Sequence, residues 1–165
     1  MTGRRAPSIR SRHDDRVERN PRTLWTIGYE RFPTPGQMIE VLEGAGVEWV
    51  IDVRALPQSR RRGFSRRALQ DHLADAGIVY EHRPGLGNPA PLREVFKAGR
   101  LEEGREAFRE HLLGDHAWGI DDVAARIDER PTAMLCLEDD PALCHRGVII
   151  EELVRRHPDV RVVRL

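Results

Sequence analysis

The sequence is poor in several features, and each scarcity excludes a class of protein. It has two cysteines among 165 residues, too few for the disulfide framework of a small secreted domain. No segment reaches the ~18 apolar residues of a membrane span, and the N-terminus lacks the apolar core of a secretory signal. We therefore expect a cytoplasmic protein with reduced thiols and no membrane contact.

An excess of charge of one sign is also missing. Lysine and arginine total 27, and aspartate and glutamate total 27. A balanced charge gives the molecule as a whole no electrostatic attraction to nucleic acid or membranes, so such binding would require a local patch. The basic residues are almost all arginine, and Lys97 is the only lysine.

Apolar segments divide the chain into alternating strands and helices. Residues 1–22 are polar and arginine-rich without an apolar period, which predicts a disordered leader before a single α/β domain at 23–165. Helical spacing follows the first, second and fourth strands. Residues 91–130 show no strand signal and predict a helical insertion of two helices, one with Leu101, Phe108 and Leu112 and another with Val123 and Ile127. This alternation predicts a three-layer, Rossmann-like domain with a mostly parallel sheet of about five strands. The predicted strands are 24–29, 48–54, 78–83, 132–138 and 160–165.

Polar residues gather where the predicted strands end. The carboxyl ends of parallel strands form the edge at which open α/β sheets bind their ligands. Four separate segments therefore converge on one rim, and from them we predict a set of ligand-binding residues. This set is Tyr29, Arg54, Ser59, Arg60, His82, Asn88 and Arg146.

Four ordered motifs carry a resemblance to a known family. They are "TIGYE", "VIDVRALPQSRRRGFS", "Y-x-H-x-x-x-LGN" and "LCLEDDPALCHR". Together they resemble the uncharacterised bacterial and archaeal family known as domain of unknown function 488, over roughly residues 24–157. The resemblance implies a compact α/β fold with a helical insertion, and it implies no established reaction.

The stretch "LCLEDDPALCHRG", at 135–147, contains both cysteines. Seven residues separate Cys136 from Cys144 and no C-x-x-C pair occurs, so the spacing disfavours a zinc site and gives no reason to expect a redox pair. A cysteine-phosphatase loop is excluded because Ala142, not arginine, stands six positions after Cys136. Cys144, at a helix start, is either an activated thiolate or a small buried residue. We predict a strand–turn–helix corner of a ligand pocket, with no metal and no cofactor.

Catalytic candidates follow from the same rim. Glu138 is the first choice as base, acid or nucleophile, and Asp52 and His145 are further candidates. Asp52 has an alternative role, which is to hold Arg54 in place. His82 also has an alternative role, as a hydrogen-bonded structural residue.

Arg146 raises a separate question. A cation in the first turn of a helix opposes the helix dipole, so it needs an anionic partner. That partner is either an external phosphate or carboxylate, or internally Glu138 or Asp140.

Two functions fit these residues. One is a hydrolase or transferase acting on a small anionic, nucleotide-like or phosphate-bearing ligand in a crevice at the C-terminal strand ends. The alternative is a non-catalytic nucleotide or nucleic-acid binding module that uses the arginine-rich loop at 59–67. This loop, "SRRRGFSRR", combines five arginines with Phe64, which suits phosphate contacts and one stacking ring.

Overall fold

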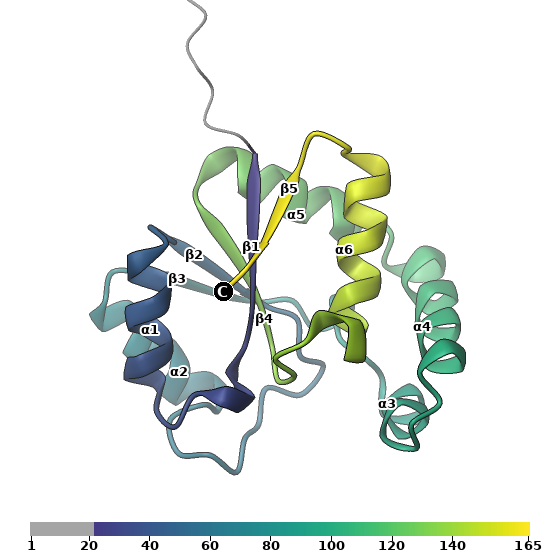
Figure 1. Ribbon diagram of the computed structural model, residues 1–165, viewed down its shortest axis with the longest axis horizontal. Coiled ribbons are helices and arrows are strands. Elements are labelled where there is room, and N and C mark those ends of the chain that lie inside the picture. The colour runs from purple at the N-terminus through teal and green to yellow at the C-terminus, as the bar shows by residue number, and fades with distance from the viewer. Residues whose placement is uncertain (1–21) are drawn as a thin grey trace, which may run out of the picture.

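The computed structural model describes residues 22–165 (Figure 1). The predicted leader lies outside the described residues except for Arg22, which belongs to the domain. Its guanidinium donates to Asp128 at 2.6 Å and to Asp159 at 3.0 Å. No helix within 22–165 has the length and apolar character needed to cross a membrane.

The centre of the fold is a five-stranded sheet in which every pair of neighbours is parallel, with the order β3-β2-β4-β1-β5. This confirms the predicted sheet. The predicted strands extend past the observed ends, for example at Tyr29 and Val53, because apolar residues continue beyond the hydrogen-bonded ladder. The strands are β1 (Thr23–Gly28), β2 (Trp49–Asp52), β3 (Val79–His82), β4 (Thr132–Cys136) and β5 (Arg161–Arg164).

Helices cover both faces of the sheet, which confirms the three layers. One apolar core joins the sheet to α1 (Pro35–Gly44) and α2 (Arg66–Asp75), and a second joins the opposite face to α4 (Leu101–Asp115), α5 (Trp118–Glu129) and α6 (His145–Arg156). Successive side chains of β4 alternate between them: Leu135 faces α1 and α2, whereas Cys136 faces α6. Cys136 therefore lies on the side of the sheet where α6 begins.

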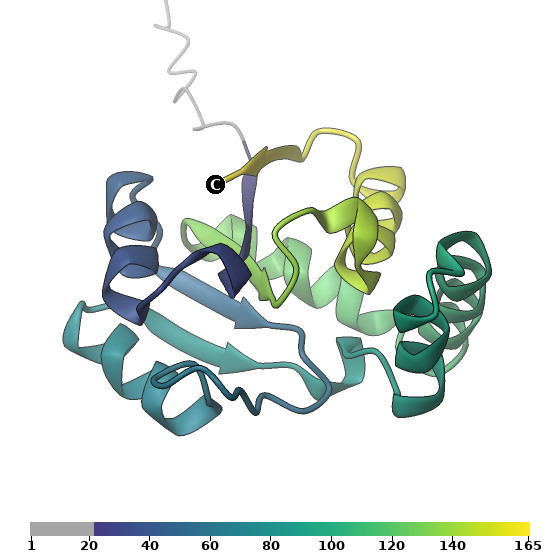
Figure 2. The ribbon, with the colours of Figure 1, turned by 60° about the horizontal axis from the view of Figure 1, so that its bottom comes forward.

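The predicted helical insertion contains one more helix than the sequence indicated. Two helices were expected within 91–130, and the structure adds α3 (Ala90–Lys97) before them. Its apolar residues Leu92, Val95 and Phe96 have helical spacing and are half-buried, but they span little more than one turn of helix. Figure 2 shows α3 and α4 beyond α6, on the side away from α1 and α2.

The strand order places a crevice at the ends of β1 and β4. These strands are neighbours, but the chain leaves β1 for α1 on one face and leaves β4 for α6 on the other. Such a switch point opens a ligand crevice outside the carboxyl ends of the strands. Gly28 allows the segment after β4 to cross the end of β1, because a Cβ there would lie 1.9 Å from the Glu138 carbonyl oxygen.

Candidate functional site

A cavity of about 450 Å³ lies at the carboxyl ends of β1, β2 and β4. We call it the β4–α6 cavity. Five of the predicted ligand-binding and catalytic residues line it, together with Arg93 of α3. These lining residues are Tyr29, Arg54, Asn88, Arg93, Glu138 and His145.

Glu138 follows β4 by two residues and faces the cavity. Its side chain is half-buried, and its Oε2 accepts a weak hydrogen bond from the Cys136 thiol at 3.4 Å. No cation of the described chain forms an ion pair with this carboxylate. Glu138 therefore has the position and the unsatisfied charge that a catalytic acid or base requires.

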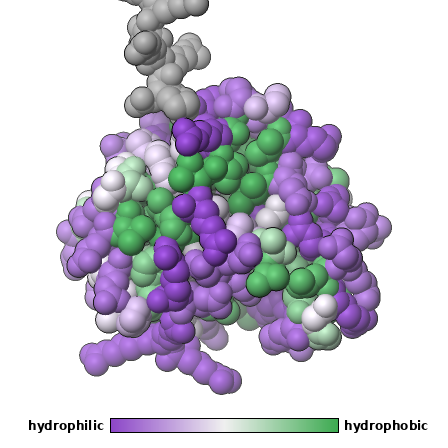
Figure 3. All heavy atoms as spheres, in the orientation of Figure 1, coloured by the Kyte–Doolittle hydropathy of each residue, from purple (hydrophilic) through white to green (hydrophobic). Residues whose placement is uncertain are grey.

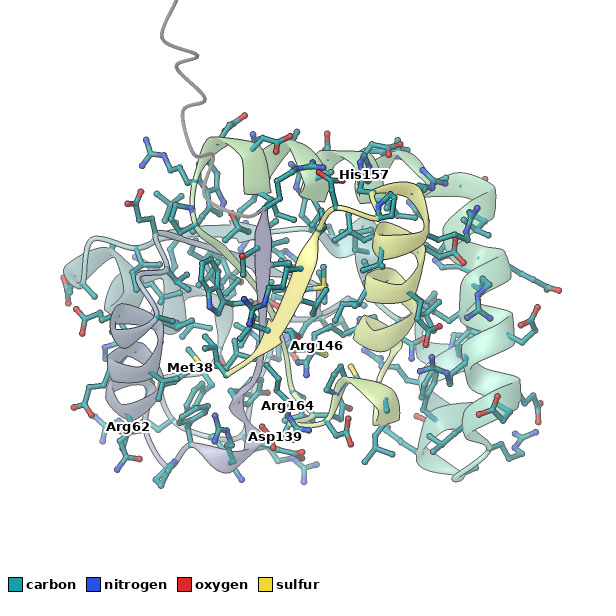
Figure 4. All side chains as sticks on the ribbon, turned by 45° about the horizontal axis from the view of Figure 1, so that its top comes forward. Met38, Arg62, Asp139, Arg146, His157 and Arg164 are labelled. Carbon is teal, nitrogen blue, oxygen red and sulfur yellow. The ribbon has the colours of Figure 1, made fainter. Side chains whose placement is uncertain are left out.

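The other acidic residues of this turn are neutralised outside the cavity. Asp139 forms ion pairs with Arg31 at 3.0 Å and with Arg164 at 2.6 Å (Figure 4). The Asp140 carboxylate accepts the backbone N–H of Ala142 at 2.9 Å. The acidic sequence of the turn therefore leaves Glu138 as the carboxylate that faces the cavity.

His145 is buried on the floor of the cavity in a defined tautomer. Its Nε2 lies 2.9 Å from the carbonyl oxygen of Val53. Because a carbonyl oxygen only accepts, Nε2 carries the proton and Nδ1 keeps a lone pair. Burial lowers the pKa of His145 to about 4, against the opposing effect of the Val53 hydrogen bond, so the ring is neutral near pH 7.

Both cysteines adjoin His145. The Sγ atoms of Cys136 and Cys144 and a ring nitrogen of His145 all lie within 4.8 Å of one another, and all three residues are buried. Burial raises the pKa of the Cys144 thiol, and neighbouring Cys136 and Glu138 raise it further. The spacing of Cys136 and Cys144 in the sequence had given no reason to expect the two thiols together.

Two basic residues of α3, Arg93 and Lys97, line the cavity, and neither was identified as a site residue from the sequence. Arg93 is half-buried, and its guanidinium has no hydrogen bond or ion pair to any residue of 22–165. Lys97 also lines the cavity and is paired with Glu94 on the exposed surface at 2.7 Å. The signal in the sequence was the spacing of Arg93 and Lys97, which places both on one face of a helix.

Asp52 and Arg54 form a buried pair rather than two open ligand groups. Arg54 binds the Asp52 carboxylate through Nε at 2.9 Å and Nη2 at 2.6 Å, and Tyr80 donates its hydroxyl to the same carboxylate at 2.6 Å. Burial disfavours the charged guanidinium, but Asp52 outweighs this effect and raises the pKa of Arg54. Asp52 is fully buried and does not line the cavity, so the alternative role of holding Arg54 in place accounts for its contacts.

Arg146 is also held internally. Its side chain is fully buried and points from the start of α6 into the molecule (Figure 4). The guanidinium donates to the carbonyl oxygens of Ile27 at 2.7 Å, Glu138 at 2.9 Å and Asp139 at 3.1 Å. Backbone carbonyls therefore take the place of both the external anion and the internal carboxylates considered for this arginine.

Three further predicted residues lie away from the cavity lining. Ser59 accepts the backbone N–H of Arg61 at 3.1 Å, and Arg60 is exposed. His82 donates from Nε2 to the Arg54 carbonyl oxygen at 2.7 Å, as its structural interpretation expects. Gly87 lets the chain pass close to the continuation of β2, because a Cβ on Gly87 would lie 2.3 Å from the Cα of Ala55.

Tyr29 and Asn88 do line the cavity. The Tyr29 ring stacks on Phe64 with a centroid distance of 4.7 Å and lies under the Arg54 guanidinium. Asn88 is buried, and its Oδ1 has no hydrogen-bond partner among residues 22–165. An unpaired buried oxygen is costly unless a ligand or water donates to it.

The mouth of the cavity is apolar. Leu56, Leu137 and Leu143 line it and are exposed by 60%, 40% and 52%. Figure 3 shows hydrophobic atoms gathered over the turn between β4 and α6. A ligand that fills the cavity would cover these side chains.

A larger hollow of about 1330 Å³ lies at the opposite edge of the sheet. Its charged residues include Arg22, Asp128 and Asp159, which neutralise one another in ion pairs. The β4–α6 cavity is therefore the better candidate, because unpaired charges and a buried polar oxygen face it.

Comparison with known families identifies a family to which most of the chain is similar. The family described as "Domain of unknown function DUF488" matches residues 34–153, which include α1, the helical insertion, β4 and most of α6. Comparison with curated proteins and with solved structures finds no match.

Proposed function

The chain belongs to the DUF488 family, a domain of unknown function, and we propose that it is a hydrolase or transferase acting on a small anionic, nucleotide-like ligand in the β4–α6 cavity. One observation carries this proposal. The Glu138 carboxylate and the Arg93 guanidinium both face the cavity, and neither has an ion-pair partner within 22–165. Two opposite charges left open in one cavity are suited to binding an anion and moving a proton.

The lining supports a ligand with three chemical parts. Arg93 favours a phosphate or carboxylate group, which its planar guanidinium binds through two hydrogen bonds. Asn88 Oδ1 would accept a hydrogen bond from a polar edge of the ligand. The exposed leucines at the mouth would cover a flat or apolar part. A volume of about 450 Å³ is suited to a ligand of nucleotide size.

Glu138 supplies the chemistry in this proposal. In hydrolysis it would accept a proton from the attacking water as the water oxygen bonds to the electrophilic centre. The bond to the leaving group then breaks, and the proton held by Glu138 passes to the leaving atom. In transfer, the hydroxyl of an acceptor takes the place of water.

The first prediction concerns Arg93. Nucleoside monophosphates or sugar phosphates are expected to raise the melting temperature of the protein, because a ligand that binds only the folded state stabilises it. Arg93→Gln should weaken binding about ten- to a hundredfold, which corresponds to the ~1.5–3 kcal/mol of a charged hydrogen bond. Arg100→Gln is the matched control, since Arg100 is paired with Glu103 outside the cavity.

Glu138→Gln separates binding from reaction in the same experiment. It should abolish turnover of a bound phosphate ester and leave the ligand-induced rise in melting temperature largely intact. Equal loss of both would contradict the catalytic role. If Arg93→Gln leaves binding unchanged, or if no nucleoside monophosphate or sugar phosphate stabilises the protein, the proposal that the β4–α6 cavity binds the ligand would be contradicted.

The loop at 59–67 supports a second candidate, a nucleic-acid binding surface. Arg60, Arg62, Arg66 and Arg67 are exposed, and their guanidinium groups form no ion pair with residues 22–165. Phe64, however, is fully buried against Tyr29, so the predicted stacking ring is absent from the surface. The loop therefore offers phosphate contacts without a stacking platform.

Salt dependence tests this second candidate. Oligonucleotide affinity should fall steeply with salt, and replacing Arg60, Arg62 and Arg66 together by alanine should make the slope of log K against log salt shallower by about 2–3. Fluorescence anisotropy of a labelled oligonucleotide measures both quantities. An unchanged slope in the triple variant would rule out this loop as the binding surface.

A further inference from the structure

Three side chains of the kinds that bind transition metals meet on the floor of the β4–α6 cavity. We propose that Cys136, Cys144 and His145 bind one Zn²⁺ ion, with its fourth coordination position open to the cavity. Their ligand atoms lie within 4.8 Å of one another, and Cys144 Sγ is 3.7 Å from His145 Nδ1. Zn–S and Zn–N bonds of about 2.3 and 2.0 Å place tetrahedral ligand atoms roughly 3.5–3.8 Å apart, so small side-chain rotations complete the site.

The ring of His145 is already oriented for a metal. Its Nε2–H donates to the Val53 carbonyl oxygen at 2.9 Å, which leaves the unprotonated Nδ1 directed at the thiols. Metal-binding histidines ordinarily donate the N–H of their second ring nitrogen to such a carbonyl or carboxylate. This hydrogen bond fixes the tautomer and the orientation of the ring. Phe108 packs edge-on against the ring at a centroid distance of 5.1 Å and further restricts it.

Cys144 is placed to carry the negative charge of a metal-bound thiolate. It is the N-cap of α6, and its Sγ accepts the backbone N–H of Arg146 at 3.3 Å. Helix N-termini stabilise negative charge, and N–H donors stabilise thiolates. Two thiolates and a neutral imidazole would also balance the two positive charges of the ion, so a buried site with no net charge results.

The ligand set and the open side indicate the metal and its kind of site. Thiolate and imidazole ligands select Zn²⁺ over Mg²⁺ or Ca²⁺, which prefer oxygen. Three protein ligands with an open position are typical of catalytic zinc, whereas structural zinc is closed by four. Glu138 Oε2 lies 3.4 Å from Cys136 Sγ on the cavity side, where it can accept a proton from a ligand in the open position.

Metal binding does not depend on the proposed anionic ligand, because all three ligands belong to the chain. The separation of Cys136 from Cys144 and His145 along the chain gave no indication that the three side chains are close in space. The short helix η3 (Pro141–Leu143) turns the chain after β4, and this turn brings the start of α6 back over Cys136. The proposed site therefore joins the end of one strand to the start of the next helix.

Titration of the full chain with metal tests the site. Reduced protein stripped with a chelator should bind one equivalent of Zn²⁺ in competition with a chromophoric chelator. Co²⁺ should give thiolate-to-cobalt charge-transfer absorption and the visible bands of a tetrahedral complex. Cys136→Ser, Cys144→Ser and His145→Gln should each weaken Zn²⁺ binding by more than roughly 100-fold, the upper range for loss of an outer hydrogen-bond partner. His72→Gln, on the exposed surface of α2, should leave binding unchanged.

The wild-type protein alone decides the question if a variant fails to fold. Reduced wild-type protein that binds no stoichiometric Zn²⁺ and gives no tetrahedral Co²⁺ spectrum would overturn the proposal. If the reduced protein has no metal affinity and a Cys136–Cys144 disulfide forms in air, the two cysteines would be a redox pair instead. Retained Zn²⁺ affinity in a folded Cys144→Ser variant would also overturn it. Because the readout is metal content, failure here leaves the anionic-ligand proposal to its own test.

Discussion

Asp52→Ala is expected to lower the free energy of unfolding by about 3–5 kcal/mol, because it leaves a buried cation without its partner. The Arg54 side chain is only 6% exposed, and the Asp52 carboxylate accepts its bonds from Nε and Nη2. The change also removes the acceptor of the Tyr80 hydroxyl, whose pKa is raised by burial and by the charge of Asp52. Urea denaturation at neutral pH measures the loss.

The control for Asp52→Ala is an ion pair on the surface. Glu94→Ala breaks the exposed contact with Lys97 and should leave the denaturation midpoint unchanged within error. Equal midpoints for the two variants would contradict a structural role for Asp52. The catalytic interpretation of this carboxylate would then regain its support.

Arg146→Ala has the second large expected effect, a loss of about 3–5 kcal/mol in the free energy of unfolding. The variant removes the three hydrogen bonds to the carbonyls of Ile27, Glu138 and Asp139, and it leaves a void in a fully buried position. Because these carbonyls belong to β1 and to the turn after β4, the site should loosen as well. Chemical denaturation measures the stability.

Arg155→Ala, on the same helix, is the matched control for Arg146→Ala. Arg155 is 63% exposed and pairs with Glu152, so its loss should cost at most about 1 kcal/mol. Similar losses for the two variants would show that the buried contacts of Arg146 contribute little. An external anion would then again be the better partner for this arginine.

Much of the fold could be predicted from the sequence because its signals are local. Apolar segments separated by helical periods define a parallel sheet covered on both faces, and the structure confirms five strands and three layers. The α3 helix was missed because its apolar residues Leu92, Val95 and Phe96 span little more than one turn of helix. An apolar period this short does not distinguish a helix from a loop.

The site was predicted only in part. The rule that ligands bind at the carboxyl ends of parallel strands identifies the segments that form the site, but it does not show which side chains contact one another there. Tyr29, Asn88, Glu138 and His145 do line the cavity, since each follows a strand end directly or through a tight turn. The partners of Arg146 are backbone carbonyls, which no residue pattern reveals. Which thiols, cations and oxygens meet there depends on how η3 and α3 fold back, and this is decided by tertiary packing.

Chemical-shift mapping of nucleoside monophosphate binding tests the central claim most directly. The account predicts that backbone amide signals of Asn88, Arg93, Glu138 and His145 shift with a single affinity, and that Arg93→Gln weakens the response at all of them. Signals around Trp25 and Asp159, at the opposite edge of the sheet, should remain unchanged. Shifts confined to that opposite hollow, or none at the β4–α6 cavity, would contradict the claim that this cavity is the ligand site.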